Sequence, residues 1–312
     1  MNPKLQAEKI TTLAGHRDCV YALEKSHLPN KFISSGGDGL VAIWDLDNPE
    51  IGKLIAQVKN SVYALRLIEE REQLLIGENM EGLHLIDLKK YQEIKTLKTS
   101  HNAIFDILCT SLDIILANAD GSLQLIDTEH WHTKLVLQLS AKSARALALH
   151  TAAEHLAVAY SDHSIRILNT KTWQVIHTLA GHQNSVFAVA YSPCGKYLWS
   201  GSRDAHLRIW SVENNYECIE AIPAHLFAIN HIVFSPLGQW AATCSMDKSI
   251  KIWDTNTFRL LKVIDKARHA GHGTSINKLL WNNYQNILIS GSDDRTIALW
   301  QIEEKPSPML HQ

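Results

Sequence analysis

The sequence predicts an all-β chain arranged as a ring of seven similar units, and three observations lead to this prediction. A short apolar segment with a polar last residue, such as Ile43-Trp44-Asp45, recurs along the chain. Its central residue falls at 44, 86, 126, 168, 210, 253 and 300, which gives steps of 42, 40, 42, 42, 43 and 47. Each unit also contains four short runs with the residue types of β-strands. A period of about 40–45 residues is typical of a β-propeller, in which each repeat is a blade that cannot bury its own faces.

The fifth unit illustrates how the four strands follow from the residues. Ser185–Ala190 is a short β-rich run, and Ser192–Gly195 contains the Pro and Gly of a turn. Tyr197–Ser202 is predicted as the second strand, and Leu207–Trp210, with alternating apolar residues, as the third. A fourth strand is expected near Cys218–Ile222. Because no unit has helical periodicity, we expect four-stranded antiparallel blades throughout.

Composition limits the function classes. Lys and Arg number 30 and Asp and Glu 32, so the formal net charge of −2 favours neither nucleic acid nor an anionic membrane as partner. No run of about 18 apolar residues predicts a membrane span. The 5 cysteines are scattered without a C-x-x-C pair, which indicates neither a disulfide framework nor a zinc site. We therefore expect a cytoplasmic protein, monomeric on its own, without a cofactor.

The chain resembles the WD-repeat (WD40) family of seven-bladed β-propellers. That family is defined by a Gly-His pair, a Ser/Thr-Gly second strand, a turn Asp and a closing Trp-Asp. In the fifth unit the matching residues are Gly181-His182, Ser200-Gly201, Asp204 and Trp210, although Ser211 follows the Trp. The resemblance covers roughly residues 5–303.

Four units have the complete hydrogen-bonding tetrad of the family, with the same 28-residue interval from His to Trp. The tetrads are His16, Ser34, Asp38 and Trp44; His182, Ser200, Asp204 and Trp210; His225, Thr243, Asp247 and Trp253; and His272, Ser290, Asp294 and Trp300. The resemblance implies that Asp accepts from the imidazole, that the imidazole meets the hydroxyl, and that the hydroxyl accepts from the indole. Such a network is expected to be structural rather than a Ser-His-Asp nucleophile, because it recurs four times and no oxyanion-hole motif accompanies it.

The second, third and fourth units depart from this pattern. The residues at the tetrad positions are Lys59-Asn60 and Met80 in the second unit; His101, Leu116, Asp120 and Ile126 in the third; and Val158, Asp162 and Leu168 in the fourth. Aliphatic packing in place of a polar network is physically acceptable. Two explanations stay open: drift compensated by packing, or a half of the ring that was reshaped around a partner.

The chain ends predict how the ring closes. After Trp300 only Gln301–Glu303 remain before a polar, Pro-containing tail, so the last blade lacks an outer strand. We expect residues 7–13 to supply it, which would pair the two ends of the chain and remove an open edge. The prediction is one propeller domain over residues 1–304, followed by a flexible tail at 305–312.

Fold does not give function, so the prediction of a site needs particular residues. In WD-repeat propellers the face with the Gly-His loops is the usual partner surface, and two positions of each repeat stand out there. The first set, early in each first strand, is Tyr21, Tyr63, Phe105, Arg145, Phe187, Asn230 and Asn277. The second set, before the turn Asp, is Gly37, Asn79, Ala119, Ser161, Arg203, Met246 and Asp293; in the second unit, which has Met80 in place of the Asp, register alone identifies Asn79.

Aromatic residues and Arg dominate the energetics of protein interfaces. We therefore expect the channel mouth to bind a peptide or protein segment, with Arg145 and Arg203 pairing an acidic group. The alternative is that the aromatic rings fill the channel entrance and contact no partner. The predicted function is a non-enzymatic interaction scaffold; the rival is an enzyme or a small-ligand or metal-binding propeller that uses the channel.

Two further candidates are weaker. His130-Trp131-His132 and His269–His272 are His-rich, but neither has Cys or carboxylate partners at ligand spacing, so no metal is expected. The longest interval contains extra residues around Asp265–His272, which form either a solvated connector or a basic contact loop.

Overall fold

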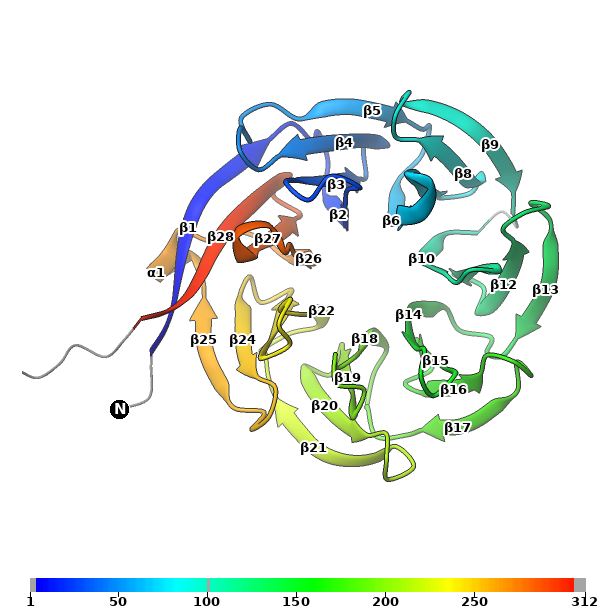
Figure 1. Cartoon of the computed structure of the whole chain (residues 1–312). Coiled ribbons are helices and arrows are strands. Elements are labelled where there is room, and N and C mark those ends of the chain that lie inside the picture. The colour runs from blue at the N-terminus through cyan, green and yellow to red at the C-terminus, as the bar shows by residue number, and fades with distance from the viewer. Residues whose placement is uncertain (1–3, 100–101, 306–312) are drawn as a thin grey trace, which may run out of the picture.

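Twenty-eight strands form seven four-stranded antiparallel sheets around a central axis, within the residues that the structure describes, 4–99 and 102–305. The structure is a computed structural model, and Figure 1 shows its blades following one another around the ring in sequence order. The predicted seven-bladed β-propeller is therefore confirmed. The strand bounds in the fifth blade also lie within one or two residues of the sequence prediction.

Each blade runs from an innermost strand at the channel to an outermost strand at the rim (Figure 1). The first three blades are β2 (Val20–Lys25), β3 (Lys31–Gly36), β4 (Leu40–Asp45) and β5 (Lys53–Gln57); β6 (Val62–Ile68), β7 (Gln73–Glu78), β8 (Gly82–Asp87) and β9 (Gln92–Lys98); and β10 (Ile104–Cys109), β11 (Asp113–Asn118), β12 (Ser122–Asp127) and β13 (Thr133–Gln138). The next three are β14 (Ala144–His150), β15 (His155–Tyr160), β16 (Ile165–Asn169) and β17 (Val175–Leu179); β18 (Val186–Tyr191), β19 (Tyr197–Ser202), β20 (His206–Ser211) and β21 (Glu217–Pro223); and β22 (Ile229–Phe234), β23 (Trp240–Ser245), β24 (Ile250–Asp254) and β25 (Leu260–Ile264). The seventh blade is β26 (Ile276–Trp281), β27 (Ile287–Ser292), β28 (Thr296–Lys305) and β1 (Lys4–Ala14).

The two ends of the chain close the ring in this seventh blade. β1 pairs antiparallel with β28, from Lys4 opposite Lys305 to Ala14 opposite Thr296. The N-terminal strand thus supplies the outer strand as predicted, and it is longer than residues 7–13. β28 includes Lys305, the first residue of the predicted tail, and residues 306–312 lie outside the described residues.

The hydrophobic core lies between blades rather than inside any one of them. One cluster joins Ile33 and Ile43 of the first blade to Leu65 and Leu74 of the second. Another joins Leu13 of β1 to residues of the first and seventh blades. Each blade therefore buries its faces against its neighbours, and contacts between blades stabilise the ring.

Helical structure is confined to three short segments of the described residues: η1 (Glu69–Arg71), α1 (Lys266–His269) and η2 (Tyr284–Asn286). None of the described helices has the length and apolar character that crossing a membrane requires. α1 lies in the connection before the seventh blade, which contains the extra residues of the longest repeat interval. Its N-cap, Asp265, accepts from the backbone N–H of Arg268 and forms an ion pair with that side chain, which neutralises one positive charge of the loop.

Candidate partner-binding site at the central channel

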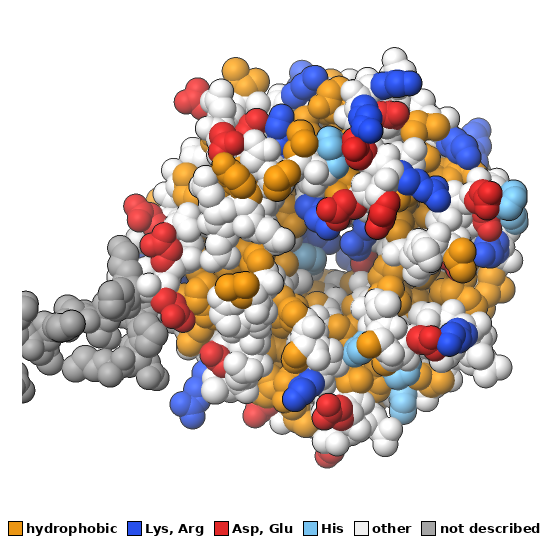
Figure 2. Space-filling model, in the orientation of Figure 1, with side chains coloured by type: hydrophobic (Ala, Val, Ile, Leu, Met, Phe, Trp, Pro, Cys, Tyr) orange, Lys and Arg blue, Asp and Glu red, His pale blue; other side chains and the backbone are white. Residues whose placement is uncertain are grey.

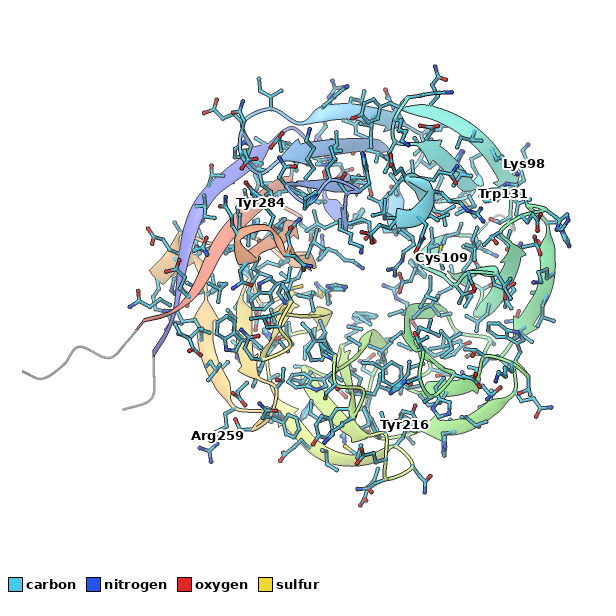
Figure 3. All side chains as sticks on the ribbon, in the orientation of Figure 1. Lys98, Cys109, Trp131, Tyr216, Arg259 and Tyr284 are labelled. Atoms are coloured by element: carbon cyan, nitrogen blue, oxygen red, sulfur yellow. The ribbon has the colours of Figure 1, made fainter. Side chains whose placement is uncertain are left out.

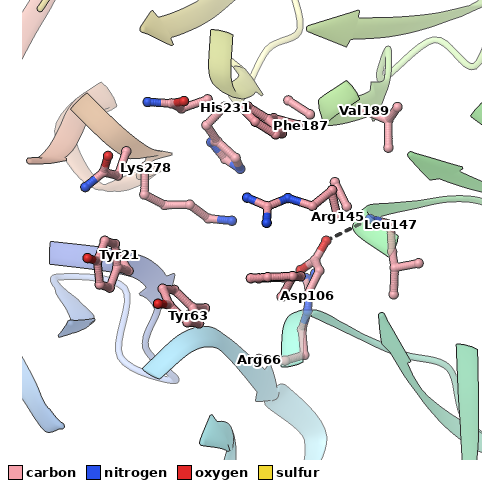
Figure 4. Close-up of a pocket in the computed structure, with 15 residues that line it drawn as sticks. Tyr21, Tyr63, Arg66, Asp106, Arg145, Leu147, Phe187, Val189, His231 and Lys278 are labelled. Atoms are coloured by element: carbon pink, nitrogen blue, oxygen red, sulfur yellow. Dashed lines mark hydrogen bonds between the residues drawn. The ribbon is translucent and has the colours of Figure 1, made fainter. Parts of the chain in front are cut away.

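A one-residue bulge in each innermost strand places the first set of candidate residues. In every blade the innermost strand pairs antiparallel with the second strand, and the pairing skips one residue of the innermost strand. The seven bulge residues are Tyr21, Tyr63, Phe105, Arg145, Phe187, Asn230 and Asn277. Bulges re-aim side chains, and here all seven side chains line one cavity of about 480 Å³ at the ring centre (Figure 4).

Five of these side chains, on five consecutive blades, form a continuous stack that we call the aromatic arc: Tyr21, Tyr63, Phe105, Arg145 and Phe187. The ring centroids of Tyr21 and Tyr63 are 4.8 Å apart, and those of Tyr63 and Phe105 are 5.6 Å apart. The guanidinium of Arg145 lies 3.9 Å from the Phe105 centroid and 4.8 Å from that of Phe187. The arc packs against itself, and the cavity beside it stays open.

Arg145 is the electrostatic centre of the arc. Burial lowers the pKa of its guanidinium from the usual value, because the charged form loses water. Within the described part of the chain it has cation–π contacts but no hydrogen-bond acceptor and no ion-pair partner. A cation held between two aromatic faces, with its hydrogen-bond donors unused, is suited to an anionic group.

The two remaining bulge residues are engaged with neighbouring blades. The Asn230 amide donates to the Ile276 carbonyl oxygen at 2.8 Å. The Asn277 amide donates to the carbonyl oxygen of Val20 at 3.1 Å and to the Asp293 carboxylate at 2.7 Å. Both side chains therefore connect adjacent blades, and both line the cavity with the aromatic arc.

The second set of candidates also occupies one equivalent position in all seven blades. In each, the backbone N–H donates to a carbonyl of the loop before the innermost strand at 2.9–3.0 Å; the donors are Gly37, Asn79, Ala119, Ser161, Arg203, Met246 and Asp293. Their side chains differ in availability. Arg203 is exposed, whereas the Asp293 carboxylate already accepts from Asn277.

Met246 belongs to an apolar surface beside the mouth that the sequence reasoning found only in part. Its backbone N–H bonds the Ala228 carbonyl, which places it against the loop that contains Leu226 and Phe227. These three side chains are 49%, 83% and 62% exposed, in the order Met246, Leu226 and Phe227. We call them the blade-six apolar patch. The adjacent residues Leu226-Phe227, directly after a tetrad His, were the signal that could have revealed it.

The structure also brings together charged residues deeper in the channel, which the sequence reasoning did not identify. One residue beyond the bulge, four blades have Ala, and the other three have Asp106, His231 and Lys278. Arg66 joins them from β6, and all four line the cavity with Arg145. Figure 4 shows the Lys278 side chain extending toward the guanidinium of Arg145, whose side chain lies above Asp106 in that view. The sequence did contain a signal for these residues: the position is Ala in four units and a charged residue or His in the other three.

Three of these side chains form hydrogen bonds with backbone groups. The Asp106 carboxylate accepts from the N–H of Leu147 at 2.8 Å and from that of Ile107 at 3.0 Å. The Arg66 Nε donates to the Ile107 carbonyl oxygen at 2.8 Å. The Nδ1 of His231 accepts a hydrogen bond from the backbone N–H of Leu279 at 3.3 Å. These bonds leave Lys278 Nζ without a hydrogen-bonding or ion-pairing partner among the described residues.

Burial and charge determine the protonation of these residues. Burial lowers the pKa of His231 well below its usual value, and the cations Lys278 and Arg66 add to this effect, so the imidazole is neutral at pH 7. Burial raises the pKa of Glu24, on β2, although Arg66 opposes it. The pKa of Arg66 is raised: burial opposes its charge, but Glu24 and Asp106 outweigh that effect. Figure 2 shows Lys, Arg, Asp and Glu side chains gathered along the rim of the central hollow over the β2–β5 and β6–β9 blades.

The tetrad residues lie at hydrogen-bonding distances in all four complete units, away from the cavity lining. In the fifth blade, Trp210 Nε1 is 2.8 Å from Ser200 Oγ, and His182 Nε2 is 2.8 Å from the same oxygen. His182 Nδ1 is 3.0 Å from the Asp204 carboxylate. Because an indole only donates, the hydroxyl accepts from it and donates to Nε2, and Nδ1–H donates to Asp204. The hydroxyl is thereby occupied on both sides, as it is in the other three units.

The departing blades combine buried aliphatic residues with polar contacts of their own. At the Ser and Trp positions they have Ile76 and Ile86, Leu116 and Ile126, and Val158 and Leu168, each at most 4% exposed. In the second blade, Asn60 donates to Glu78, and Glu78 also contacts His84 at 2.8 Å. In the fourth, Ser140 donates to Asp162. In the second blade the sequence reasoning missed these contacts because Glu78 and His84 lie outside the tetrad positions. In the fourth, Asp162 is the tetrad Asp, but its partner is a Ser rather than the His of the family pattern. His101 of the third unit lies outside the described residues.

The His-rich candidates lie away from the channel. Trp131, in the centre of the first trio, lies on the outer side of its blade (Figure 3), and the rings of His130 and His132 are 6.1 Å apart. In the second segment, His272 belongs to a tetrad. No group of three or more His, Cys, Asp or Glu side chains among residues 4–99 and 102–305 could hold a metal ion.

Comparisons with known proteins agree with this architecture. The family model described as WD domain, G-beta repeat matches residues 7–45, 173–211, 216–254 and 265–301. These are the four units with complete tetrads. The chain is 24% identical to human striatin-3 over 216 residues, which is 68% of this chain and 23% of striatin-3. It is 28% identical to nuclear distribution protein nudF 1 of Talaromyces marneffei over 243 residues, 68% of this chain and 52% of that protein.

The chain therefore spans less than a quarter of striatin-3 and about half of nudF 1. Among solved structures, the WD40 β-propeller domain of Doa1 superimposes with a TM-score of 0.83 at 19% identity, over 94% of this chain and 96% of that one. At this identity the likeness concerns the fold alone. With four repeats matched by the family model and seven blades in the ring, the chain is a WD-repeat protein that folds as a seven-bladed β-propeller.

Proposed function

We propose that this protein is a non-enzymatic interaction scaffold that binds a peptide or protein segment across the channel mouth. The observation that carries the proposal is the aromatic arc: four aromatic rings and one unpaired Arg in continuous contact at the edge of an open cavity. Rings and guanidinium groups that are already packed lose little side-chain entropy on binding. Such groups are therefore efficient interface anchors.

Two neighbouring features support the same surface. The blade-six apolar patch, Leu226, Phe227 and Met246, adds exposed apolar area beside the mouth, of the kind that marks interaction sites. The exposed Arg203 of the adjacent blade is available for an acidic group. The bound segment would contact the arc and Arg145 at one side, and the patch at the other, with Asn230, Asn277 and Asp293 between them.

The partner class follows from charge. The formal net charge of −2 gives no general attraction to nucleic acid or an anionic membrane, so the proposed partner is a protein. We propose that the chain acts in the cytoplasm and that it is monomeric until it meets its partner. The rival function, catalysis or small-ligand binding in the channel, is favoured by one observation, the charged residues below the arc.

The test is a double substitution in the arc, Tyr63→Ala with Phe105→Ala. Loss of a single interface anchor costs about 2 kcal/mol or more, which is about a 30-fold loss of affinity. We expect affinity purification from the native organism, followed by mass spectrometry, to lose at least one partner. Leu237→Ala, at an 87% exposed residue of the turn between β22 and β23, is the matched control and should keep every partner. Identical partner sets for wild type and the arc variant, at equal stability, would overturn the proposal.

A further inference from the structure

The central cavity contains two cations that approach each other without a counter-charge between them. Arg145 and Lys278 come from blades on different sides of the ring and extend toward one another (Figure 4). Among the described residues, neither has a hydrogen-bond acceptor or an ion-pair partner. The one carboxylate in the cavity lining, Asp106, accepts two backbone N–H groups instead. Two partly desolvated like charges in one cavity are unfavourable, and an anionic group between them would relieve that cost.

We propose that Arg145 and Lys278 form a binding site for a single carboxylate. The inference rests on the proposed function for the source of this carboxylate, an Asp or Glu side chain of the bound segment that enters the channel past the aromatic arc. A guanidinium fork can hold both oxygens of a carboxylate, and the ammonium of Lys278 can approach from the other side.

The charged residues of the cavity lining favour an anion. Arg66, Arg145 and Lys278 are cations, and Asp106 is the one carboxylate among the lining residues. Burial and the nearby cations keep the imidazole of His231 neutral, so His231 adds no charge. The lining therefore has an excess of positive charge, which a bound carboxylate reduces.

The geometry also assigns roles to the neighbouring residues. Phe105 and Phe187 hold the Arg145 guanidinium between their faces at 3.9 and 4.8 Å, so its orientation is fixed before a ligand arrives. The neutral imidazole of His231 accepts from a backbone N–H through Nδ1, which leaves its Nε2–H as a further donor in the cavity. A preorganised set of donors binds an anion with little reorganisation.

The experiment uses two small probes of nearly equal shape at constant ionic strength: succinamide, which is neutral, and succinamate, a monoanion. Inorganic phosphate is the third probe. Binding to the full chain is measured by ligand-observed NMR. We expect succinamate to bind at least tenfold more tightly than succinamide, and more tightly than phosphate. Equal binding of the neutral and monoanionic probes, or no binding of either, would overturn the proposal. Tighter binding of phosphate than of succinamate would also overturn it, in favour of a phosphate site.

Variants separate this site from general charge effects. Lys278→Gln should weaken succinamate binding at least tenfold, Lys278→Arg should retain it, and Lys171→Gln, at an exposed residue in the turn between β16 and β17, should leave it unchanged. Unchanged binding in Lys278→Gln would refute the site.

A second arm tests the source of the carboxylate with the captured partner. Replacing its acidic residues by their amides should weaken binding to wild type and have no further effect on binding to Lys278→Gln. Additive effects would refute the proposed pairing. If the arc variant keeps all its partners while succinamate still binds, the proposed function fails and the carboxylate site stands.

Discussion

Because β1 closes the ring, we predict that its deletion destabilises the protein, and the structure gives the expected loss of stability. Deleting residues 1–13 removes nearly all of the pairing with β28, from Lys4 opposite Lys305 to Leu13 opposite Ile297. It also removes Leu5 and Leu13, which are 5% and 3% exposed. Burying a leucine is worth about 1.5–3 kcal/mol, so the two together contribute about 3–6 kcal/mol before any hydrogen bonds are counted. A domain is typically stable by only about 5–15 kcal/mol.

The loss should appear in two measurements. The urea midpoint should fall, and the melting temperature should drop by roughly 10 °C. The unpaired edge of β28 should also increase aggregation, measured by light scattering at the wild-type concentration. Melting of the truncated chain at the wild-type temperature would refute the closure argument.

Point variants in the same strand sharpen this test. Leu13→Ala should cost about 2–5 kcal/mol, because Leu13 packs in the cluster between the first and seventh blades. Ile10→Ala is the matched control: Ile10 is 48% exposed and lies at the register shift between Lys9 and Thr11. It should change stability by about 0.5 kcal/mol or less. Equal losses in the two variants would contradict the assigned register.

Three further predictions concern the blade framework. Ser200→Ala should lower the free energy of unfolding in urea by about 1–3 kcal/mol, because it leaves Trp210 and His182 without their shared partner; an unchanged midpoint would contradict this. Burial pushes the pKa of Asp204 up, but hydrogen bonds from His182 and two backbone N–H groups hold it below the usual range, so its stabilisation is present above the unfolded pKa of about 4 and lost as the pH falls further; an Asp204→Asn variant should show a smaller loss of stability below that pH. Gly39 has φ +69° and an added Cβ would lie 2.4 Å from a carbonyl oxygen, so Gly39→Ala should destabilise the first blade by about 1 kcal/mol or more, measurable by thermal unfolding.

The sequence predicted the architecture well because the fold repeats. Seven equivalent positions, such as that of Tyr21, can be aligned by spacing alone, and the structure places each of the seven residues at the bulge of its own innermost strand. The interior of the channel could not be predicted in the same way. Asp106, His231 and Lys278 occupy a position that is Ala in the other blades, and their proximity depends on the diameter of the ring rather than on any spacing in the chain.

The polar substitutes in the departing blades were missed for a related reason. Glu78 lies two residues beyond the tetrad position occupied by Ile76, and its partners, Asn60 and His84, come from different parts of the unit. A prediction based on the family's tetrad positions assigns no contact to such residues. Only the folded register of β6, β7 and β8 brings them together.

The central claim is that the channel mouth binds a protein partner through the aromatic arc. The most direct test is the dissociation constant of the captured partner, measured by isothermal titration calorimetry against wild type, Tyr63→Ala and Leu237→Ala. We predict that Tyr63→Ala raises the dissociation constant about 30-fold, and that Leu237→Ala changes it less than about twofold. Equal dissociation constants for all three proteins would contradict the claim.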